Sequence, residues 1–273
     1  MPQVSVVSTV HNGSDHIEQV AESILGQEFE RFEWLILDDR STDETPALLA
    51  DLADDHHKVR VLTPEKRLGR ARGLNRVVDA ADGEYIAQQD IDDTSDPQRL
   101  SQQAAYLDEH EGVGAVGAYY ERIDKIRQEH YVREPPTDHT ALVRALTKYI
   151  PLAHTLVMFR KRAWQDAGGY PLTDDFEDIR LWIRMVDAGW HLATVPDVLG
   201  THVVYEGSTW NRRFSYRRRQ RRLAVVQATA VRRLAVPSWM YVYPLARLVY
   251  PSLPSALKRY VRRAVVGLSE RPI

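Results

Sequence analysis

The chain of 273 residues has no cysteine. This absence excludes a disulfide framework, a thiolate metal site and a cysteine nucleophile, so any bound metal must use oxygen or imidazole ligands. The N-terminal segment MPQVSVVSTVHN also lacks the charged region, apolar stretch and cleavage site of a signal peptide, and we therefore expect a cytoplasmic location. No run reaches the ~20 apolar residues of a spanning helix, so the sequence predicts no transmembrane segment.

Acidic residues are scarce in the last part of the chain. Residues 211–273 contain 15 of the 36 Lys and Arg residues but one of the 38 Asp and Glu residues, a formal charge of +14, which leaves −16 for residues 1–210. This division indicates that the C-terminal segment contacts an anionic partner, while the rest of the chain contains a carboxylate-rich site.

Short β-branched runs alternate with helical patterns in the first part of the chain, which is typical of a parallel sheet covered by helices. Strands are expected over 4–10, 32–39, 59–63 and 84–89, with one helix capped by Ser14, one beginning at Pro46 and one over 69–81. The later pattern is mixed, with helices over 97–110, 138–150 and 176–189 and strands over 113–123 and 155–160.

Polar residues stand at the ends of three of these expected strands. They are the segment from Thr9 to Asn12, the pair Asp38-Asp39 and the segment from Asp90 to Asp93. Ligands of open α/β sheets bind beyond the carboxyl ends of the strands, so we expect these groups to converge.

The acidic cluster QDIDD, residues 89–93, is the strongest chemical signal. Three carboxylates within four positions repel one another unless a cation or hydrogen-bond donors compensate. Oxygen ligands suit Mn²⁺ or Mg²⁺, and a diphosphate would supply further oxygens. The alternative is a solvated acidic turn or a helix cap.

A second carboxylate pair, Asp38-Asp39, precedes Ser41-Thr42-Asp43. A carboxylate accepts a hydrogen bond from a base N–H and a hydroxyl donates to phosphate or ribose, so this turn could bind a nucleotide. Capping of the next helix by Ser41 or Asp43 explains the same residues.

The ordered series VSVVSTVHNG, FEWLILDDRSTDET, GRARGLNRVVDAADGEYIAQQDIDD and FEDIRLWIRM resembles the inverting family 2 glycosyltransferases over residues 3–205. The resemblance implies a GT-A fold, an α/β architecture with a Rossmann-like, mostly parallel sheet flanked by helices. It divides the chain into a catalytic domain over 1–210, with a nucleotide-binding part (1–95) and an acceptor part (96–210). A basic helical C-terminal extension over 211–273 follows.

The resemblance also implies roles for single residues in donor binding. Thr9, His11 and Asn12 match the loop after the first strand, and Asp39 matches the carboxylate that binds the base, commonly uracil. Arg72 and Asn75 match a segment that lines the nucleotide pocket. Asp90, Asp92 and Asp93 match the DxDD signature, with Asp90 and Asp92 beside the donor and Asp92 and Asp93 placed for the metal, Mn or Mg.

Asp178, with its neighbour Glu177, matches the acidic general base of the family. A sugar hydroxyl is a poor nucleophile, and a positioned carboxylate accelerates its attack by ~10²–10⁴-fold. A divalent cation stabilises the charge on the leaving nucleoside diphosphate, and one direct displacement inverts the anomeric centre. The alternative for the pair is a pair of acids favoured by the dipole of a helix N-terminus.

Departures from the family pattern narrow the expected activity. No QxxRW signature of processive synthases is present, so transfer of a single sugar is favoured. His11 replaces the common aromatic before Asn12, and Tyr205 stands where relatives often have a histidine before a serine, here Ser208. His202 is three residues earlier, where a structural role competes with a role as metal or phosphate ligand.

The C-terminal extension is rich in arginine, with Arg212, Arg213, Arg217, Arg218, Arg219, Arg221 and Arg222 in eleven positions, followed by a stretch of aromatic and aliphatic residues. This composition suits a segment on an anionic membrane surface, where each basic residue contributes ~1 kcal/mol. The alternative is a basic helix folded against the acidic body. No nucleic-acid recognition module is present, and we expect no nucleic-acid partner.

The sequence thus predicts a glycosyltransferase of the hexosyltransferase type (EC 2.4), peripheral on the cytoplasmic membrane face. It would pass one sugar from a nucleotide donor, UDP-sugar favoured, to a lipid-linked or glycan acceptor. The rival interpretations are an inactive homologue that binds nucleotide sugar or glycan, and a protein that binds anionic surfaces through its arginines.

Overall fold

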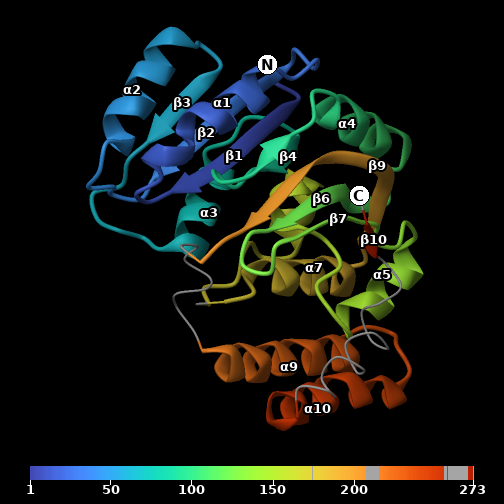
Figure 1. The fold of residues 1–273 in the computed structure, drawn as a ribbon. Helices are drawn as coiled ribbons and strands as arrows, with labels where there is room; N and C mark the ends of the chain where they lie inside the picture. Colours follow the sequence, from blue (N-terminus) through green and yellow to red (C-terminus); the bar gives the residue numbers. More distant parts are fainter. Residues whose placement is uncertain (174, 207–214, 255–256, 258–269, 273) are drawn as a thin grey trace.

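A computed structural model describes residues 1–173, 175–206, 215–254, 257 and 270–272 of the chain. Its centre is a sheet with the strand order β10-β7-β6-β8-β4-β1-β2-β3 (Figure 1). The first four strands are β1 (Val4–Val10), β2 (Phe32–Asp38), β3 (Val59–Leu62) and β4 (Tyr85–Gln88), and all are parallel. Their carboxyl ends therefore meet at one edge, as the alternating sequence pattern predicts.

Helices cover both faces of this parallel half because its strands bury side chains on both sides. Val6 and Ile36 contact the helices α1 (Ile17–Leu25), α2 (Thr45–Asp55) and α4 (Arg99–Glu109) in one apolar cluster. Val7 and Leu35 belong to a second cluster with α3 (Arg70–Asp79) and α6 (Lys161–Asp166). The core is thus divided by the sheet into two layers.

The second half of the sheet is mostly antiparallel. It contains β5 (Thr94–Ser95), β6 (Val113–Asp124), β7 (Glu129–Arg133), β8 (Met158–Arg160) and β9 (His191–Val204). The long strand β9 runs parallel to β6 and pairs with the short β5. The helices α5 (His139–Leu146) and α7 (Glu177–Asp187) add their apolar residues to the second cluster.

The elements α6, β7 and β9 were not predicted, and two expected elements near the site differ in the structure. Ser14 does not cap α1 with its side chain: a 3-10 turn, η1 (Ser14–His16), precedes the helix, and the Ser14 backbone N–H lies 3.3 Å from Asp43 Oδ2. The strand expected over 155–160 is shorter, because η2 (His154–Leu156) forms a turn whose Thr155 hydroxyl accepts a hydrogen bond from the Asp90 N–H at 3.0 Å. Both departures follow from contacts with distant loops, which local propensity does not contain.

The C-terminal extension folds onto the body as α9 (Tyr216–Arg233), η3 (Ser238–Tyr241), α10 (Val242–Val249) and η4 (Tyr250–Ser252), and β10 (Glu270–Pro272) pairs with β7. Leu223, Val226 and Ala230 of α9 belong to the same apolar cluster as α7, and Figure 1 shows α10 below α9 as the outermost layer. Ser208, Arg212 and Arg213 lie outside the described residues. Among the helices of the described part, none has the length and apolarity to cross a bilayer.

Candidate active site

The loops that follow β1 and β2 are tied together by hydrogen bonds. The Asn12 N–H donates to Ser41 Oγ at 2.9 Å, and Asn12 Oδ1 accepts from the Thr42 N–H at 2.8 Å. Asn12 and Arg40 both have left-handed backbone conformations, at φ 57° and φ 63°. The hydrogen bonds and these conformations hold the two loops together as one wall at the carboxyl end of the sheet.

Asp39 connects this wall to the segment after β3. Its carboxylate accepts hydrogen bonds from the backbone N–H groups of Leu68 at 2.6 Å and Gly69 at 2.8 Å, and His11 Nδ1 lies 3.1 Å from the Asp39 carbonyl oxygen. Gly69 has φ 77°, which suits glycine, and α3 begins at the next residue. Asp39 therefore fixes the position from which α3 leaves the sheet edge, with Thr9 beneath Gly73 of that helix.

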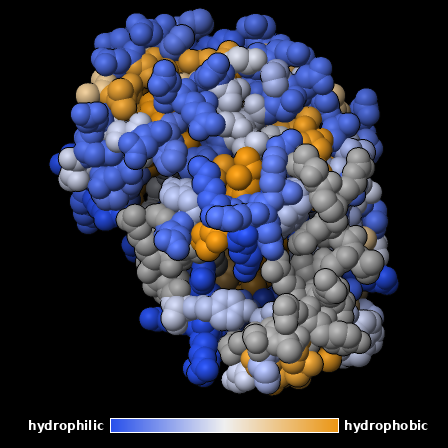
Figure 2. Space-filling model, viewed as in Figure 1, coloured by the Kyte–Doolittle hydropathy of each residue, from blue (hydrophilic) through white to orange (hydrophobic). Residues whose placement is uncertain are grey.

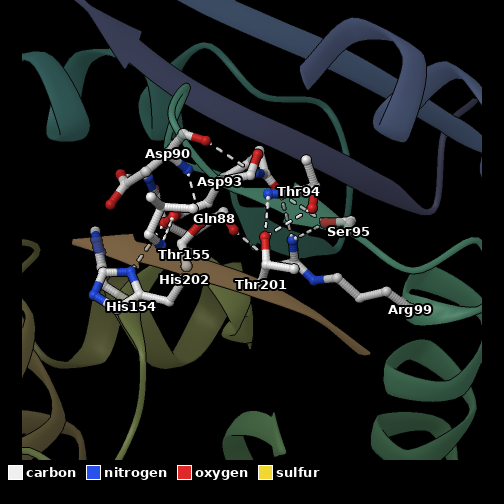
Figure 3. A network of polar contacts seen from close by, with 12 residues as sticks. Gln88, Asp90, Asp93, Thr94, Ser95, Arg99, His154, Thr155, Thr201 and His202 are labelled. Atoms are coloured by element: carbon white, nitrogen blue, oxygen red, sulfur yellow. Dashed lines mark hydrogen bonds and ion pairs between the residues drawn. The ribbon is translucent and has the colours of Figure 1, made fainter. Parts of the chain in front are cut away.

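The acidic loop after β4 is held from below by a buried arginine. Arg99 of α4 is fully buried, and its guanidinium donates to the Gln88 carbonyl at 2.7 Å, to Gln89 Oε1 at 2.9 Å and to Ser95 Oγ at 2.8 Å. Burial lowers the pKa of Arg99 to about 9. Figure 3 shows this side chain reaching under the loop that carries the carboxylates.

Asp93 faces β9 rather than solvent. It is 1% exposed, and its carboxylate accepts from the Val203 N–H at 2.7 Å and lies 3.1 Å from His202 Nδ1 (Figure 3). Burial would lower the pKa of His202, but the Asp93 carboxylate outweighs burial and raises it. This contact favours the structural interpretation of His202.

Asp92 points instead towards a cavity of about 270 Å³ that is also lined by His16, Lys125 and Tyr205. Burial, together with repulsion from Asp93 and Asp90, raises the pKa of Asp92 to about 6. A cation beside this carboxylate would offset the repulsion, so the residues fit a divalent metal at Asp92. Within the described part of the chain, no three His, Asp or Glu side chains stand together in a ready-made metal cluster.

Arg70, at the first turn of α3, joins the acidic loop to α7. Its Nε donates to Glu177 Oε1 at 2.6 Å, and its Nη2 donates to Asp90 Oδ1 at 3.0 Å. Nη2 also lies 3.0 Å from His154 Nδ1. Because arginine only donates, this nitrogen of His154 accepts, and the Nε2–H is left to donate to Tyr170 Oη at 2.9 Å.

The contacts with Arg70 also set the protonation states of His154 and Asp90. Burial and the Arg70 cation lower the pKa of His154 to about 4, which keeps the imidazole neutral. Burial alone would raise the pKa of Asp90, but the Arg70 charge outweighs it, and the pKa of Asp90 falls. Asp90 is thus an ionised carboxylate held in place by an arginine.

Asp178 stands next to Glu177 in the first turn of α7, after Phe176 with its left-handed backbone at φ 53°. Burial, followed by repulsion from Glu177, raises the pKa of Asp178 to about 7. A carboxylate with this pKa gains and loses a proton near neutral pH, which is what a general base requires. Its neighbour Glu177 is held by Arg70, so the turn that carries Asp178 is tied to Asp90 through one guanidinium.

The site residues predicted from the sequence have different partners in the structure. Arg70 binds both Asp90 and Glu177, and it thereby holds the turn that carries Asp178 beside the acidic loop. Asn75 instead binds the backbone of Tyr170: its Oδ1 accepts from the N–H at 2.8 Å and its Nδ2 donates to the carbonyl at 2.9 Å.

Arg72 is exposed on α3, and it is Arg70, two residues before it, that contacts the acids. Arg70, His154 and Tyr170 were not predicted as site residues from the sequence. The motif GRARG contained the signal for Arg70, but His154 and Tyr170 have no local pattern.

Comparison with known proteins shows that the chain has the GT-A glycosyltransferase fold. It matches the mannosyltransferase PcManGT of Pyrobaculum calidifontis, solved with GDP-Man and Mn²⁺, with a TM-score of 0.70 and 22% identity over 97% of this chain and 76% of that chain. The model of glycosyl transferase family 2 matches residues 5–167. The putative glycosyltransferase EpsE of Bacillus subtilis is 30% identical over 98% of this chain and 96% of its own length.

The chain therefore belongs to glycosyl transferase family 2, and the predicted fold class and enzyme class are confirmed: it is a transferase that uses nucleotide-sugar donors. A further relative is the UDP-Glc:alpha-D-GlcNAc-diphosphoundecaprenol beta-1,3-glucosyltransferase WfaP of Escherichia coli. It is 25% identical over 69% of this chain and 72% of its own length.

Proposed function

We propose that this enzyme transfers a single sugar to a lipid-linked or glycan acceptor by one direct displacement that inverts the anomeric centre, with Asp178 as general base. The observation that carries the proposal is the position of Asp178: a partly buried carboxylate with a pKa of about 7, in a turn that Arg70 ties to Asp90. A base of this pKa is ionised often enough at neutral pH to act and basic enough to accept a proton in the transition state.

In the proposed donor complex, the nucleotide lies over the carboxyl ends of β1, β2 and β4. Asp39 has both oxygens on backbone N–H groups, yet a carboxylate has about four lone-pair sites and can accept a base N–H as well. Thr9, His11 and Asn12 form the opposite wall, and Asp90 and Asp92 bind near the ribose and diphosphate. The exposed guanidinium of Arg72 would reach the phosphates, while Asn75 would support the pocket through Tyr170. A UDP-sugar is favoured, in line with the name of the relative WfaP.

The proposed metal is Mn²⁺ or Mg²⁺, held by Asp92 with Asp93 behind it. Asp93 already accepts from β9 with both oxygens, so Asp92 supplies the more available carboxylate. When bound, the cation neutralises charge on the diphosphate leaving group. The presence of Mn²⁺ in the PcManGT complex, a protein of the same fold, supports this assignment.

In the proposed reaction, Asp178 accepts the proton of the acceptor hydroxyl while the hydroxyl oxygen forms a bond to the anomeric carbon. The bond between that carbon and the diphosphate oxygen breaks, and the electron pair leaves with the nucleoside diphosphate. Glu177 acts as a positioning residue, because its ion pair with Arg70 fixes the first turn of α7. The parts 1–95 and 96–210 then bind donor and acceptor respectively.

Exchange of Asp178 for asparagine tests the proposal. Asp178→Asn should lower turnover by about 10²–10⁴-fold, because the proton acceptor is lost, and leave donor affinity nearly unchanged. Release of UDP from UDP-glucose, UDP-N-acetylglucosamine and other donors, with a synthetic N-acetylglucosaminyl-diphosphate lipid as acceptor, measures turnover, and calorimetry measures donor binding. Asp187→Asn at the other end of α7 is the matched control. Lost donor binding, or turnover equal to that of the control, would contradict the role.

A further inference from the structure

The helix α10 exposes its apolar side chains. Val242, Leu245, Leu248 and Val249 lie on the surface, with Leu245 61% and Val249 59% exposed. Single exposed apolar residues are ordinary, but a cluster on one short helix marks a contact surface. Figure 2 shows an orange patch at the lower edge of the molecule, in the region where Figure 1 places α10.

The charged residue of the same helix points inward. Arg247 donates from Nε to Gln227 Oε1 at 2.8 Å, from Nη1 to Gln220 Oε1 at 2.6 Å and from Nη2 to the Lys148 carbonyl at 2.7 Å. Burial lowers the pKa of Arg247. A helix that faced water would place its leucines on α9 and its arginine in solvent. The reversed arrangement is expected where the outer face of the helix meets an apolar medium.

Exposed basic and aromatic side chains lie on the two elements next to α10. On α9, which packs against α10, Arg217, Arg221 and Arg232 are exposed. Trp239 and Tyr241 of η3 are exposed at the start of α10. Arginine on long stems and amphipathic rings is the composition found at the boundary between acyl chains and phosphate groups.

We propose that α10 docks on an anionic lipid bilayer, with its Leu and Val side chains inserted among the acyl chains and the exposed arginines of α9 on lipid phosphates. A bilayer surface offers both kinds of contact, acyl chains for the apolar side chains and phosphate groups for the arginines. The helix has eight residues, about 12 Å at 1.5 Å per residue, so it lies in the interface rather than crossing the ~30 Å hydrocarbon core. This docking goes beyond the proposed transfer reaction.

An ion pair links α9 to the segment that precedes the proposed base. Arg222 of α9 forms an ion pair with Asp175, which is 1% exposed and stands three residues before Asp178. The membrane face and the acceptor side of the site are therefore connected through one helix.

Vesicle flotation of the full chain tests the docking. The wild type should float with phosphatidylcholine vesicles that contain phosphatidylglycerol and much less with phosphatidylcholine alone. The double variant Leu245→Glu, Leu248→Glu should bind roughly tenfold or more weakly, because two charges enter the acyl region. Leu48→Glu, an exposed leucine on α2, is the matched control and should float like the wild type. Exchange of Arg217, Arg221 and Arg232 for glutamine should remove the preference for the anionic vesicles.

Three results would overturn the docking: a wild type that does not float, a double variant that floats as well as the wild type, or a wild-type dimer that the double variant converts to a monomer. The last result would assign the face to a second copy of the chain. Stabilisation of the double variant by UDP and Mn²⁺ shows that its donor site is folded. Because this stabilisation and UDP release do not require vesicles, failure of the docking is separable from failure of the proposed reaction.

Discussion

Asp178 keeps its proton in the folded enzyme to a higher pH than in the unfolded chain. Its pKa is raised from 3.8 to about 7 by burial and by Glu177. The native state therefore binds more protons than the unfolded state between about pH 4 and pH 7, and the stability contributed by this group falls as pH rises through that range. The carboxylate of the proposed base thus destabilises the fold at the pH where it acts.

This conflict predicts that Asp178→Asn stabilises the protein while it lowers turnover. Relative to the wild type, the gain in unfolding free energy should be small near pH 4, grow towards pH 7 and reach at most about 4 kcal/mol, since one pKa unit corresponds to ~1.4 kcal/mol. Thermal unfolding of both proteins across this range is the measurement. A variant that is less stable than the wild type at about pH 8 would show that Asp178 has a structural role.

Arg70 should be more sensitive to a conservative change than Arg76. A lysine at position 70 keeps the charge but cannot reach Glu177, Asp90 and His154 together, because these contacts use two nitrogens of one planar group. We expect Arg70→Lys to lower kcat by about 10–100-fold, since the turn that carries Asp178 loses its position. Arg76→Lys, at an exposed position of the same helix, is the control.

The readout that identifies Arg70 as a positioning residue is the pH profile. A lysine ammonium that lies farther from Asp90 and Asp178 lowers the pKa of these two carboxyl groups less than the arginine does, so the activity of Arg70→Lys should depend on pH differently from that of the wild type. An unchanged profile with equal losses in both variants would contradict this role.

Residue identities at the sheet edge were largely predictable, and their partners were not. The carboxylates at Asp39, Asp90 and Asp178 follow from order along the chain, because strand ends and a helix start are visible locally. The inward bonds of Asn75 to Tyr170 and of Asp93 to β9 join positions about a hundred residues apart. The spacing of residues along the sequence does not predict such pairs, because they form only when the two halves of the sheet pack together.

At the scale of elements, α4 supports the acidic loop through Arg99. The guanidinium is buried beneath Gln88, Gln89 and Ser95, and truncation would leave these acceptors without their donor. Arg99→Met should cost roughly 3–5 kcal/mol of stability, because breaking a buried charged network leaves unpaired polar groups. Chemical denaturation measures this loss, with Glu109→Ala at the exposed end of α4 as the control. A loss below about 1 kcal/mol would show that the loop is held by other contacts.

The parallel elements were easier to predict than the antiparallel ones for a physical reason. The strands β1, β2 and β4 are short, buried on both faces and separated by helices, so their pattern is local. The strand β9 (His191–Val204) was not predicted, because its second half is only partly buried and its pairing with β6 is interrupted by irregularities. Its identity depends on the partner strand and not on its own sequence.

At the scale of the whole molecule, the arginines of the basic C-terminal segment fall into two groups. Part of the basic tail pairs with the body, as in the contacts of Arg222 with Asp175 and of Arg233 with Asp187. Other arginines of α9 remain on the surface. The structure thus shows that part of the basic segment folds against the acidic body, and the proposed contact with an anionic surface is assigned to the arginines that remain exposed.

Donor and metal should stabilise the whole domain together. A ligand that binds only the native state raises stability by about 2.7 kcal/mol at a hundredfold excess over Kd. We therefore expect UDP to raise Tm more with Mn²⁺ than without it, and Asp92→Asn to abolish the difference. Differential scanning fluorimetry measures this shift, and Asp96→Asn outside the cluster is the control. An equal metal effect in the wild type and Asp92→Asn would place the metal elsewhere.

The pH dependence of turnover tests the central claim most directly, since it reports on the protonation state of the proposed base. With saturating UDP-sugar and Mn²⁺, kcat should rise with pH to a plateau, with an apparent pKa of about 7, and Asp178→Asn should retain only a low activity without this rise. A wild-type profile that is flat across this range, or the same rise in Asp178→Asn, would contradict the assignment of Asp178 as the group that accepts the acceptor's proton.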